Sequence, residues 1–240
     1  MSYTGQFTVK TRDCDIYGHW KPSSMLEEMQ EVAVSHCEAV GLGRRVTDGL
    51  GVVWVLSRCR VELSRTPRNG ETVSLETFAL PMKHLFFPRV HLLRDADGAA
   101  IGGALGYWLM MDVNTRRIVK PEYILEHLPF EDREAPVRAP MTVRPMDGEP
   151  QAVNIQPRFT EFDLNGHVNN ARYLDWCWNA LGFEALRGRE LAAFDVNYDS
   201  EILPGCDVRA ELCRSGEDFS FCGFLGDKRS FGISGSLRDA

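Results

Sequence analysis

The chain concentrates polar side chains in one short segment, FDLNGHVNN at Phe162–Asn170. An acid, an amide and an imidazole follow one another at spacings of two, as Asp163, Asn165 and His167, just before a predicted helix. Glu201 lies 34 residues after His167 in a strand-like stretch and supplies a second carboxylate. A histidine can exchange a proton near neutral pH, a carboxylate can orient it or act as a base, and an amide can hold a reacting oxygen. Hydrolysis by an activated water needs these residue types.

The same spacing occurs a second time near the start of the chain, as DIYGH at Asp15–His19. Its acid, glycine and histidine match those of the later segment at a constant offset of 148 residues. Further along, Pro67–Val73 resembles Pro204–Val208. We interpret the chain as a diverged internal repeat, in which two halves share one architecture.

The two copies differ at the positions that carry chemistry. Tyr17 stands where the second copy has the amide of Asn165. Near the place of Glu201 the first copy has Ser64 and Arg65, neither of which is an acid. We therefore expect one catalytic half and one degenerate half, whose Asp–His pair is a structural relic of a second site.

Helical periodicity predicts one long helix in each half, at about Pro22–Val40 and Val168–Leu181. Proline suits the first turn of the earlier helix, and the glycines Gly41 and Gly182 mark the two ends. Each helix presents one face of regularly spaced residues: Met25, Met29, Val32 and His36 in the first, and Tyr173, Trp176 and Ala180 in the second.

Alternating or β-rich segments predict an antiparallel sheet in each half, with turns such as Asp97-Gly98 between the strands. In the first half the predicted strands are Gln6–Thr11, Val52–Leu63, Thr72–Leu80, Phe86–Asp95 and Ala99–Asp112. In the second half they are Asn154–Phe159, Ala192–Ser200, Asp207–Cys213, Phe219–Leu225 and Ser230–Leu237.

A polar, proline-rich segment separates the halves, since six of the twelve prolines fall between Pro129 and Pro157. We predict an N-terminal unit at 1–128, a linker at 129–153 and a C-terminal unit at 154–240.

Composition excludes several function classes. The net charge of −7 argues against general nucleic-acid binding, and no apolar run is long enough to span a membrane. The first ten residues, MSYTGQFTVK, lack the apolar core of a signal peptide. The cysteines are odd in number and form no C-x-x-C pair, so we expect reduced thiols in a cytoplasmic protein without structural zinc. They are Cys14, Cys37, Cys59, Cys177, Cys206, Cys213 and Cys222.

The joint pattern resembles the acyl–acyl carrier protein (acyl-ACP) thioesterases, the fatty-acid-releasing family of plants and bacteria. In the second half the resemblance rests on Asp163-x-Asn165-x-His167-Val168-Asn169-Asn170, Tyr173, Trp176 and Tyr198-x-x-Glu201. In the first half it rests on Glu28–Ala33, Gly41–Gly43, Val53–Arg58, Trp108–Asp112 and Thr115–Arg117. H-V-N-N-x-x-Y alone also occurs in single-unit acyl-CoA thioesterases, whereas the joint pattern is specific.

The resemblance implies an α+β fold of two tandem hotdog units, each a long helix wrapped by an antiparallel sheet. It implies that Asp163, Asn165, His167 and Glu201 are catalytic. Plant members carry a cysteine directly after the glutamate, and this chain has Ile202 there. A cysteine nucleophile at that position is therefore excluded, and attack by a water is the remaining mechanism.

The sequence leaves the division of roles partly open. Backbone N–H groups at the start of the helix near Val168 are expected to stabilise the oxyanion, with Asn165 holding the carbonyl or the water. Glu201 and His167 share the general-base role, and Asp163 fixes the loop. The competing interpretation of Asp163, Asn165 and Asn169 is plain loop and N-cap chemistry, which these residue types also favour.

By the same resemblance the first unit forms the tunnel for the acyl chain. Met25, Met29, Trp54 and Trp108 are predicted to line it, and Asn169 to contact substrate, although residues of these types are most often plain core. His36 is predicted as a core or pocket-lining residue. His84, His91 and His127 show no spacing for metal ligation, and no cofactor is expected.

An acyl carrier protein is acidic, so an acidic enzyme needs a local cationic surface to dock it. Arg116, Arg117 and Lys120 are the predicted docking cluster, with pairs at Arg44–Arg45 and Arg65–Arg68 as alternatives. Ordinary solvated turn charge is the competing interpretation.

Three hypotheses follow for function. The first is an acyl-ACP thioesterase that releases a free fatty acid. The second is an acyl-CoA thioesterase on the same scaffold, and the third is a non-catalytic acyl-binding protein. Two fused units complete the usual pairing of hotdog folds, so both a monomer and a homodimer are compatible with the sequence.

Overall fold

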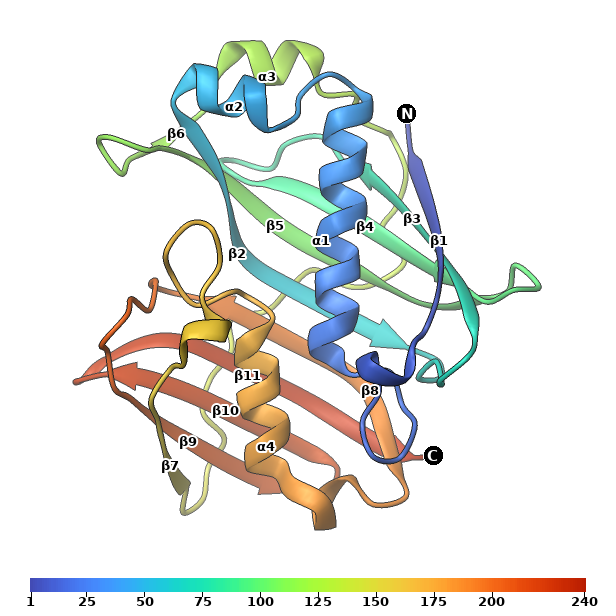
Figure 1. The fold of residues 1–240 in the computed structure, drawn as a ribbon, viewed down its shortest axis with the longest axis vertical. Helices are drawn as coiled ribbons and strands as arrows, with labels where there is room; N and C mark the ends of the chain where they lie inside the picture. Colours follow the sequence, from blue (N-terminus) through green and yellow to red (C-terminus); the bar gives the residue numbers. More distant parts are fainter.

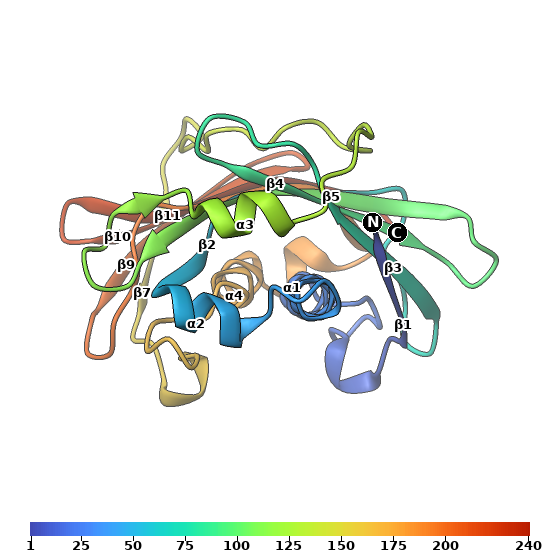
Figure 2. The same ribbon diagram turned by 90° about the horizontal axis from the view of Figure 1, so that it is seen from above.

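Two long helices lie side by side against one face of a single curved antiparallel sheet (Figures 1 and 2). The computed structural model describes residues 1–240. The helices are α1 (Pro22–Ala39) and α4 (Arg172–Leu186). The sheet has 11 strands in the order β1-β3-β4-β5-β2-β8-β11-β10-β9-β7, with β6 paired to β5. One helix from each half of the chain therefore packs on one shared sheet, as the predicted pair of hotdog units requires.

The first unit contributes six strands and two short helices besides α1. Its strands are β1 (Tyr3–Thr8), β2 (Val52–Leu63), β3 (Thr72–Ala79), β4 (Phe87–Arg94), β5 (Ala100–Asp112) and β6 (Ile118–Val119). Its short helices are α2 (Arg44–Leu50) and α3 (Glu122–His127), and a 3₁₀ turn at Thr11–Asp13 precedes α1.

The second unit has the same order of a first strand, a 3₁₀ turn, a long helix and further strands, with fewer additional elements. A 3₁₀ turn at Phe159–Glu161 precedes α4, and the strands are β7 (Gln151–Ile155), β8 (Arg189–Tyr198), β9 (Val208–Ser215), β10 (Asp218–Leu225) and β11 (Lys228–Asp239). None of the helices in either unit has the length and hydropathy that crossing a lipid bilayer needs.

The two units join edge to edge where β2 pairs with β8, in the register Arg58↔Asn197 to Glu62↔Ala193. The buried Arg60 guanidinium pairs with the buried Asp195 carboxylate across this junction. The other Asp195 oxygen accepts a hydrogen bond from the Met141 backbone N–H at 3.0 Å. Because both charges are buried and partnered, losing either one would leave the other uncompensated.

The segment between α3 and β7 crosses the outer face of the sheet, opposite the long helices (Figure 2). Its backbone is held by side chains of the sheet: Val143 N–H donates to Asn197 Oδ1 at 2.7 Å, and Met146 N–H donates to Ser220 Oγ at 2.9 Å. The connection is therefore packed against both units.

The helical faces predicted from periodicity are buried, since Met25, Met29, Val32 and His36 are each less than 9% exposed. The second helix begins four residues later than predicted, at Arg172. Gly182 has φ 72° and ψ 177°, which is not a helical conformation, so the regular helix ends after Leu181 as predicted. Beyond this kink a further turn reaches Leu186. The predicted first strands of the two halves lie three residues too late, because the 3₁₀ turns occupy their ends.

Candidate active site

The segment Asp163–His167 forms a tight loop that closes on its own backbone. Asp163 N–H donates to the His167 carbonyl at 3.0 Å, and Gly166 N–H donates to the Asp163 carbonyl at 3.0 Å. Gly166 has φ 79°, a left-handed conformation that glycine adopts without a steric penalty. Asp163 Oδ1 accepts the Asn165 backbone N–H at 2.8 Å, the side-chain-to-backbone bond of an Asx turn. The carboxylate of Asp163 thus shapes the loop itself.

His167 lies between two carboxylates. Its Nδ1 is 3.7 Å from Asp163 Oδ2, and its Nε2 is 3.9 Å from Glu201 Oε1. Nδ1 also lies 3.3 Å from the Val168 carbonyl, to which only a protonated nitrogen can donate. This tautomer leaves Nε2 as a proton acceptor on the side of Glu201. The imidazole side chain is 20% exposed, so solvent reaches it.

Glu201 comes to the loop through the chain that follows β8. Its neighbour Ile202 is fully buried, and the Ile202 carbonyl accepts the Val168 backbone N–H at 2.9 Å. This bond ties the two segments together and holds Glu201 beside His167. The residue after the glutamate is not a nucleophile, since Ile202 has an apolar side chain that belongs to the main core.

Two aromatic residues of the sequence pattern hold the segments on either side of this loop by hydrogen bonds. Tyr198 OH donates to the Asn170 carbonyl at 2.8 Å, and Trp176 Nε1 donates to Glu161 Oε1 at 2.6 Å. Glu161 belongs to the 3₁₀ turn just before the loop. Helix α4 and strand β8 therefore fix the loop from both of its ends.

The amides of the segment have different surroundings. Asn165 is exposed, and its Nδ2 lies 3.5 Å from Asp163 Oδ2, so its amide remains open to an incoming group. Asn169 Oδ1 accepts the Ala171 backbone N–H at 2.9 Å and so acts in the start of helix α4. For Asn169 this contact favours the N-cap interpretation, and its predicted contact with substrate stays a prediction.

Two of the predicted oxyanion donors at the helix start are already engaged. Helix α4 begins at Arg172, and the backbone N–H groups of Val168 and Asn169 already donate to the carbonyls of Ile202 and Glu161. These N–H groups serve the fold of the loop. The exposed amide of Asn165 is the side-chain donor of the segment that remains available for a carbonyl oxygen.

Arg116, predicted as a docking residue, reaches the site itself. Its Nη2 donates to Glu201 Oε2 at 2.5 Å, from the turn between β5 and β6 in the first unit. This hydrogen bond raises the pKa of the Arg116 guanidinium. Arg117 and Lys120, the other two members of the predicted cluster, are exposed and form no ion pair.

Comparison with known proteins identifies the family of the chain. The N-terminal domain of the acyl-ACP thioesterases matches residues 1–126, and the C-terminal domain of the same family matches residues 146–224. The chain belongs to the acyl-ACP thioesterase family. The family resemblance predicted from the sequence is thereby confirmed.

Among curated relatives, the chain is 25% identical over 217 residues to the chloroplastic acyl-[acyl-carrier-protein] hydrolase FATB3 of Cuphea viscosissima, covering 84% of this chain and 52% of that protein. It is 27% identical over 224 residues to the chloroplastic oleoyl-acyl carrier protein thioesterase 2 of Arabidopsis thaliana, covering 84% of this chain and 60% of that protein. The chain thus spans between half and two thirds of the length of these relatives.

Solved structures share the fold over nearly the whole chain. An acyl-ACP thioesterase from Bacteroides thetaiotaomicron has a TM-score of 0.90 at 23% identity and covers 99% of this chain and 98% of its own. The 12:0-ACP thioesterase from Umbellularia californica has a TM-score of 0.90 at 20% identity and covers 100% of this chain and 98% of its own. The α+β fold of two tandem hotdog units is confirmed.

The predicted tunnel residues of this family member lie inside the first unit. Met25 and Met29 are buried in the main core, which both units share. Trp54 packs edge-on against Phe87 with ring centroids 5.0 Å apart, and its buried Nε1 has no hydrogen-bond partner. Trp108 is paired with Leu56 of β2 and with Phe87 of β4. No contact joins these residues to the Asp163–His167 loop, so their role toward an acyl chain remains a prediction.

Sequence reasoning did not find a buried polar cluster in the same unit. Arg89 donates to His36 Nδ1 at 2.9 Å and to Thr77 Oγ1 at 3.3 Å, and no carboxylate pairs with it. Burial and the nearby guanidinium lower the pKa of His36 to about 4 and that of His91 to about 3. The spacing of the helix places His36 on its buried face, whereas no spacing in the sequence marks Arg89 or His91 as its buried neighbours.

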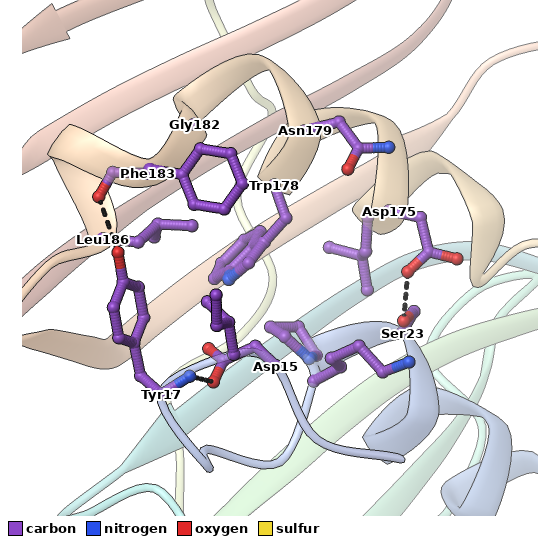
Figure 3. Close-up of a pocket in the computed structure, with 13 residues that line it drawn as sticks. Asp15, Tyr17, Ser23, Asp175, Trp178, Asn179, Gly182, Phe183 and Leu186 are labelled. Atoms are coloured by element: carbon purple, nitrogen blue, oxygen red, sulfur yellow. Dashed lines mark hydrogen bonds between the residues drawn. The ribbon is translucent and has the colours of Figure 1, made fainter. Parts of the chain in front are cut away.

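The degenerate loop Asp15–His19 faces the far end of α4 across a cavity of about 270 Å³ (Figure 3). Tyr17 OH donates to the Phe183 carbonyl at 3.1 Å, and the Ser23 hydroxyl donates to Asp175. The kink at Gly182 lies on the wall of this cavity. The Tyr17 contact links the two units where the second copy has an open amide.

Proposed function

We propose that this chain hydrolyses the thioester of fatty acyl-ACP and releases a free fatty acid. The observation that carries this proposal is the placement of His167 between two carboxylates, beside the exposed amide of Asn165. The family of the chain supplies the substrate class, since the relatives named above are acyl-ACP hydrolases and thioesterases.

Both His167 Nε2 and Glu201 Oε1 accept hydrogen bonds, and they lie 3.9 Å apart. One water can donate a hydrogen to each of them, which brings its oxygen lone pair toward a carbonyl carbon above the loop. Either acceptor takes the proton as the water oxygen attacks, and general-base catalysis of this kind contributes about 10²–10⁴-fold. The C–S bond then breaks, and the proton goes to the leaving thiolate.

Asn165 is the proposed donor to the carbonyl oxygen, because its amide is exposed and the backbone N–H groups of Val168 and Asn169 are occupied. A single donor to a developing oxyanion is worth about 10²–10³-fold. Asp163 is proposed to keep the loop folded and to hold the Nδ1 side of the imidazole.

The first unit is proposed to hold the acyl chain between α1 and the sheet, with Met25, Met29, Trp54 and Trp108 as chain contacts. Arg117 and Lys120 are proposed to meet the acidic carrier protein, since both charges are exposed and unpaired. Seven free cysteines fit a reducing compartment and support a cytoplasmic location, whereas the plant relatives are named chloroplastic.

The test is release of free acid from a panel of acyl-ACPs and matching acyl-CoAs of varied chain length, with Glu201→Gln as the control. Fast hydrolysis of the ACP series that depends on Glu201 would support the proposal and give the preferred chain length. Preference for the CoA series would make the protein an acyl-CoA thioesterase. Binding of both series without hydrolysis would contradict the proposal and leave the acyl-binding alternative.

A further inference from the structure

Hydrogen bonds to the carboxylate of Asp112 fix the conformation of the turn between β5 and β6. Asp112 Oδ1 accepts the backbone N–H groups of Asn114 at 3.1 Å and Thr115 at 2.7 Å, and also the Thr115 hydroxyl at 2.9 Å. The next residue, Arg116, has φ 58°, and besides glycines only His84 shares a positive φ in this chain. A left-handed conformation is costly for a residue with a long side chain and is often found at functional sites.

This backbone places the Arg116 guanidinium on the carboxylate of Glu201, 85 residues away in the sequence and in the other unit. The two oxygens of Glu201 have separate partners. Oε2 accepts from Arg116 Nη2 at 2.5 Å, and Oε1 faces His167 Nε2 at 3.9 Å. Arg116 therefore occupies the oxygen that does not face the imidazole, and it leaves free the oxygen that does.

Arg116 provides the one side-chain hydrogen bond that Glu201 makes. The carboxylate is 35% exposed, so packing alone does not select one rotamer for it. The pair is accessible to solvent, and its value lies in the orientation of the carboxylate, because exposed ion pairs add little to stability.

We propose that Arg116 is a positioning residue, which holds the carboxylate of Glu201 by one oxygen and directs the other oxygen toward His167. The active site is then assembled from both units, and the first unit supplies part of its chemistry. This inference rests on the proposed thioester hydrolysis. It also reassigns Arg116, whose charge already has a partner and is not free to dock a carrier protein.

The experiment compares Arg116→Asn, Arg116→Lys and the wild type on two substrates, an acyl-ACP and the matching acyl-N-acetylcysteamine thioester, which has no carrier protein. Asparagine tolerates the left-handed backbone, so Arg116→Asn should keep the wild-type thermal midpoint. Arg187→Gln is the matched control, because Arg187 is an exposed arginine that pairs with Glu184 at 3.0 Å on helix α4.

We expect Arg116→Asn to lower kcat about 10–100-fold on both substrates, as expected for a small misplacement of a catalytic group. Arg116→Lys should recover part of the loss in kcat, because it restores a positive donor to Glu201. Arg187→Gln should match the wild type on both substrates.

Three results would separate the possibilities. A rise in KM on acyl-ACP alone, with unchanged kcat on the carrier-free thioester, would overturn positioning and restore docking. A fall in kcat for Arg116→Asn on both substrates that Arg116→Lys does not recover at all would also overturn it. Hydrolysis of neither substrate by the wild type would reject the proposed function itself, a failure distinct from that of Arg116.

Discussion

The two loops of the repeat have the same backbone and different surroundings. Asp15 N–H donates to the His19 carbonyl at 2.9 Å, as Asp163 N–H donates to His167 at 3.0 Å. The loop glycines have φ values of 81° and 79°, and the Asp–His side-chain pairs are 3.8 Å and 3.7 Å apart. An Asp, a Gly and a His at these spacings therefore specify the shape of the loop in both halves.

The difference lies in what faces the imidazole. His19 is buried, and its Nε2 has no hydrogen-bond partner, whereas the Nε2 of His167 faces Glu201. In the first loop the amide is replaced by Tyr17, whose hydroxyl is committed to the Phe183 carbonyl. The comparison teaches that the Asp–Gly–His pattern is mainly structural, and that Asn165, Glu201 and Arg116 distinguish the proposed catalytic copy.

The largest expected effect comes from changing the same residue in the two loops. His167→Gln should lower kcat/KM for acyl-ACP by about 10²–10⁴-fold, because a proton acceptor is lost. His19→Gln should leave kcat/KM within about twofold and lower only the thermal midpoint, since a buried ring is replaced. Similar losses of activity in both variants, with both proteins folded by circular dichroism, would show that the first loop is also catalytic.

Asn165 and Tyr17 occupy the second position at which the two loops differ. Exchanging these residues should have the next largest effect. Asn165→Tyr copies the first loop into the second and should lower kcat about 10²–10³-fold, the cost of losing a donor to an oxyanion. Tyr17→Asn makes the reverse change and should cost about 0.5–1.5 kcal/mol of unfolding free energy with unchanged kcat, because it removes one hydrogen bond.

Steady-state kinetics and urea unfolding on the same two samples test this swap. If Asn165→Tyr retained wild-type kcat, the amide would have no part in the reaction and the loop chemistry would rest on His167 and Glu201 alone.

Local sequence rules predicted the loops and the long helices because these depend on neighbours in the chain. Pro22 at the start of α1 and the spacing of its apolar face are such local signals. The start of α4 was misplaced since the Asn169 side chain, through its bond to Ala171, delays the helix. The stop at Gly182 was predicted correctly because a positive φ is a local preference of glycine, whereas the further turn that buries Ala185 was not predicted.

The contacts that complete the proposed site could not be read from the sequence. Arg116 and Glu201 are joined by a turn of one unit reaching a loop of the other, and no local pattern encodes that approach. The charges of Arg116 and Arg117 look alike in sequence, although only one of them has a partner in the fold. Tertiary placement, which sequence periodicity does not contain, decides which charge pairs with Glu201 and which stays free.

Two histidines in the interior of the first unit, outside the proposed site, make the stability of the protein depend on pH. In the folded protein the pKa of His36 is about 4 and that of His91 about 3, both below the ordinary value of 6.5. The unfolded chain therefore binds more protons below pH 6.5, and the free energy of unfolding falls as pH drops from about 6.5 toward 4. Each such proton contributes a slope of at most about 1.4 kcal/mol per pH unit.

Urea unfolding at pH 7.5, 6.0 and 5.0 measures this slope. His91→Gln should make stability less dependent on pH across that range, while His84→Gln, at an exposed turn position, should leave the slope as in the wild type. An unchanged slope in His91→Gln would show that His91 is protonated in the folded protein.

The smallest expected effect concerns the thiols near Glu201. Cys206 lies in a turn in which its backbone N–H donates to the Leu203 carbonyl at 3.2 Å, and no hydrogen bond of its side chain is present. Cys206→Ala should change kcat less than about twofold, since the half-buried thiol makes no hydrogen bond and the substitution removes only its sulfur atom from the edge of the core. Free-acid release from acyl-ACP measures it.

Ile202→Cys is the informative partner of this variant, because it restores the residue that plant members carry after the glutamate. The Ile202 side chain is fully buried, and its carbonyl holds Val168. The new thiol should therefore face the core and give no increase in kcat, while the lost side-chain volume lowers stability by about 1–3 kcal/mol. Loss of all activity in Cys206→Ala would replace the water mechanism with a thiol nucleophile. Faster turnover in Ile202→Cys, together with a gained sensitivity to a thiol reagent, would show that a thiol at position 202 can act as the nucleophile. The contrast between the two loops would then rest on a cysteine position, and no longer on the carboxylate and amide that face His167.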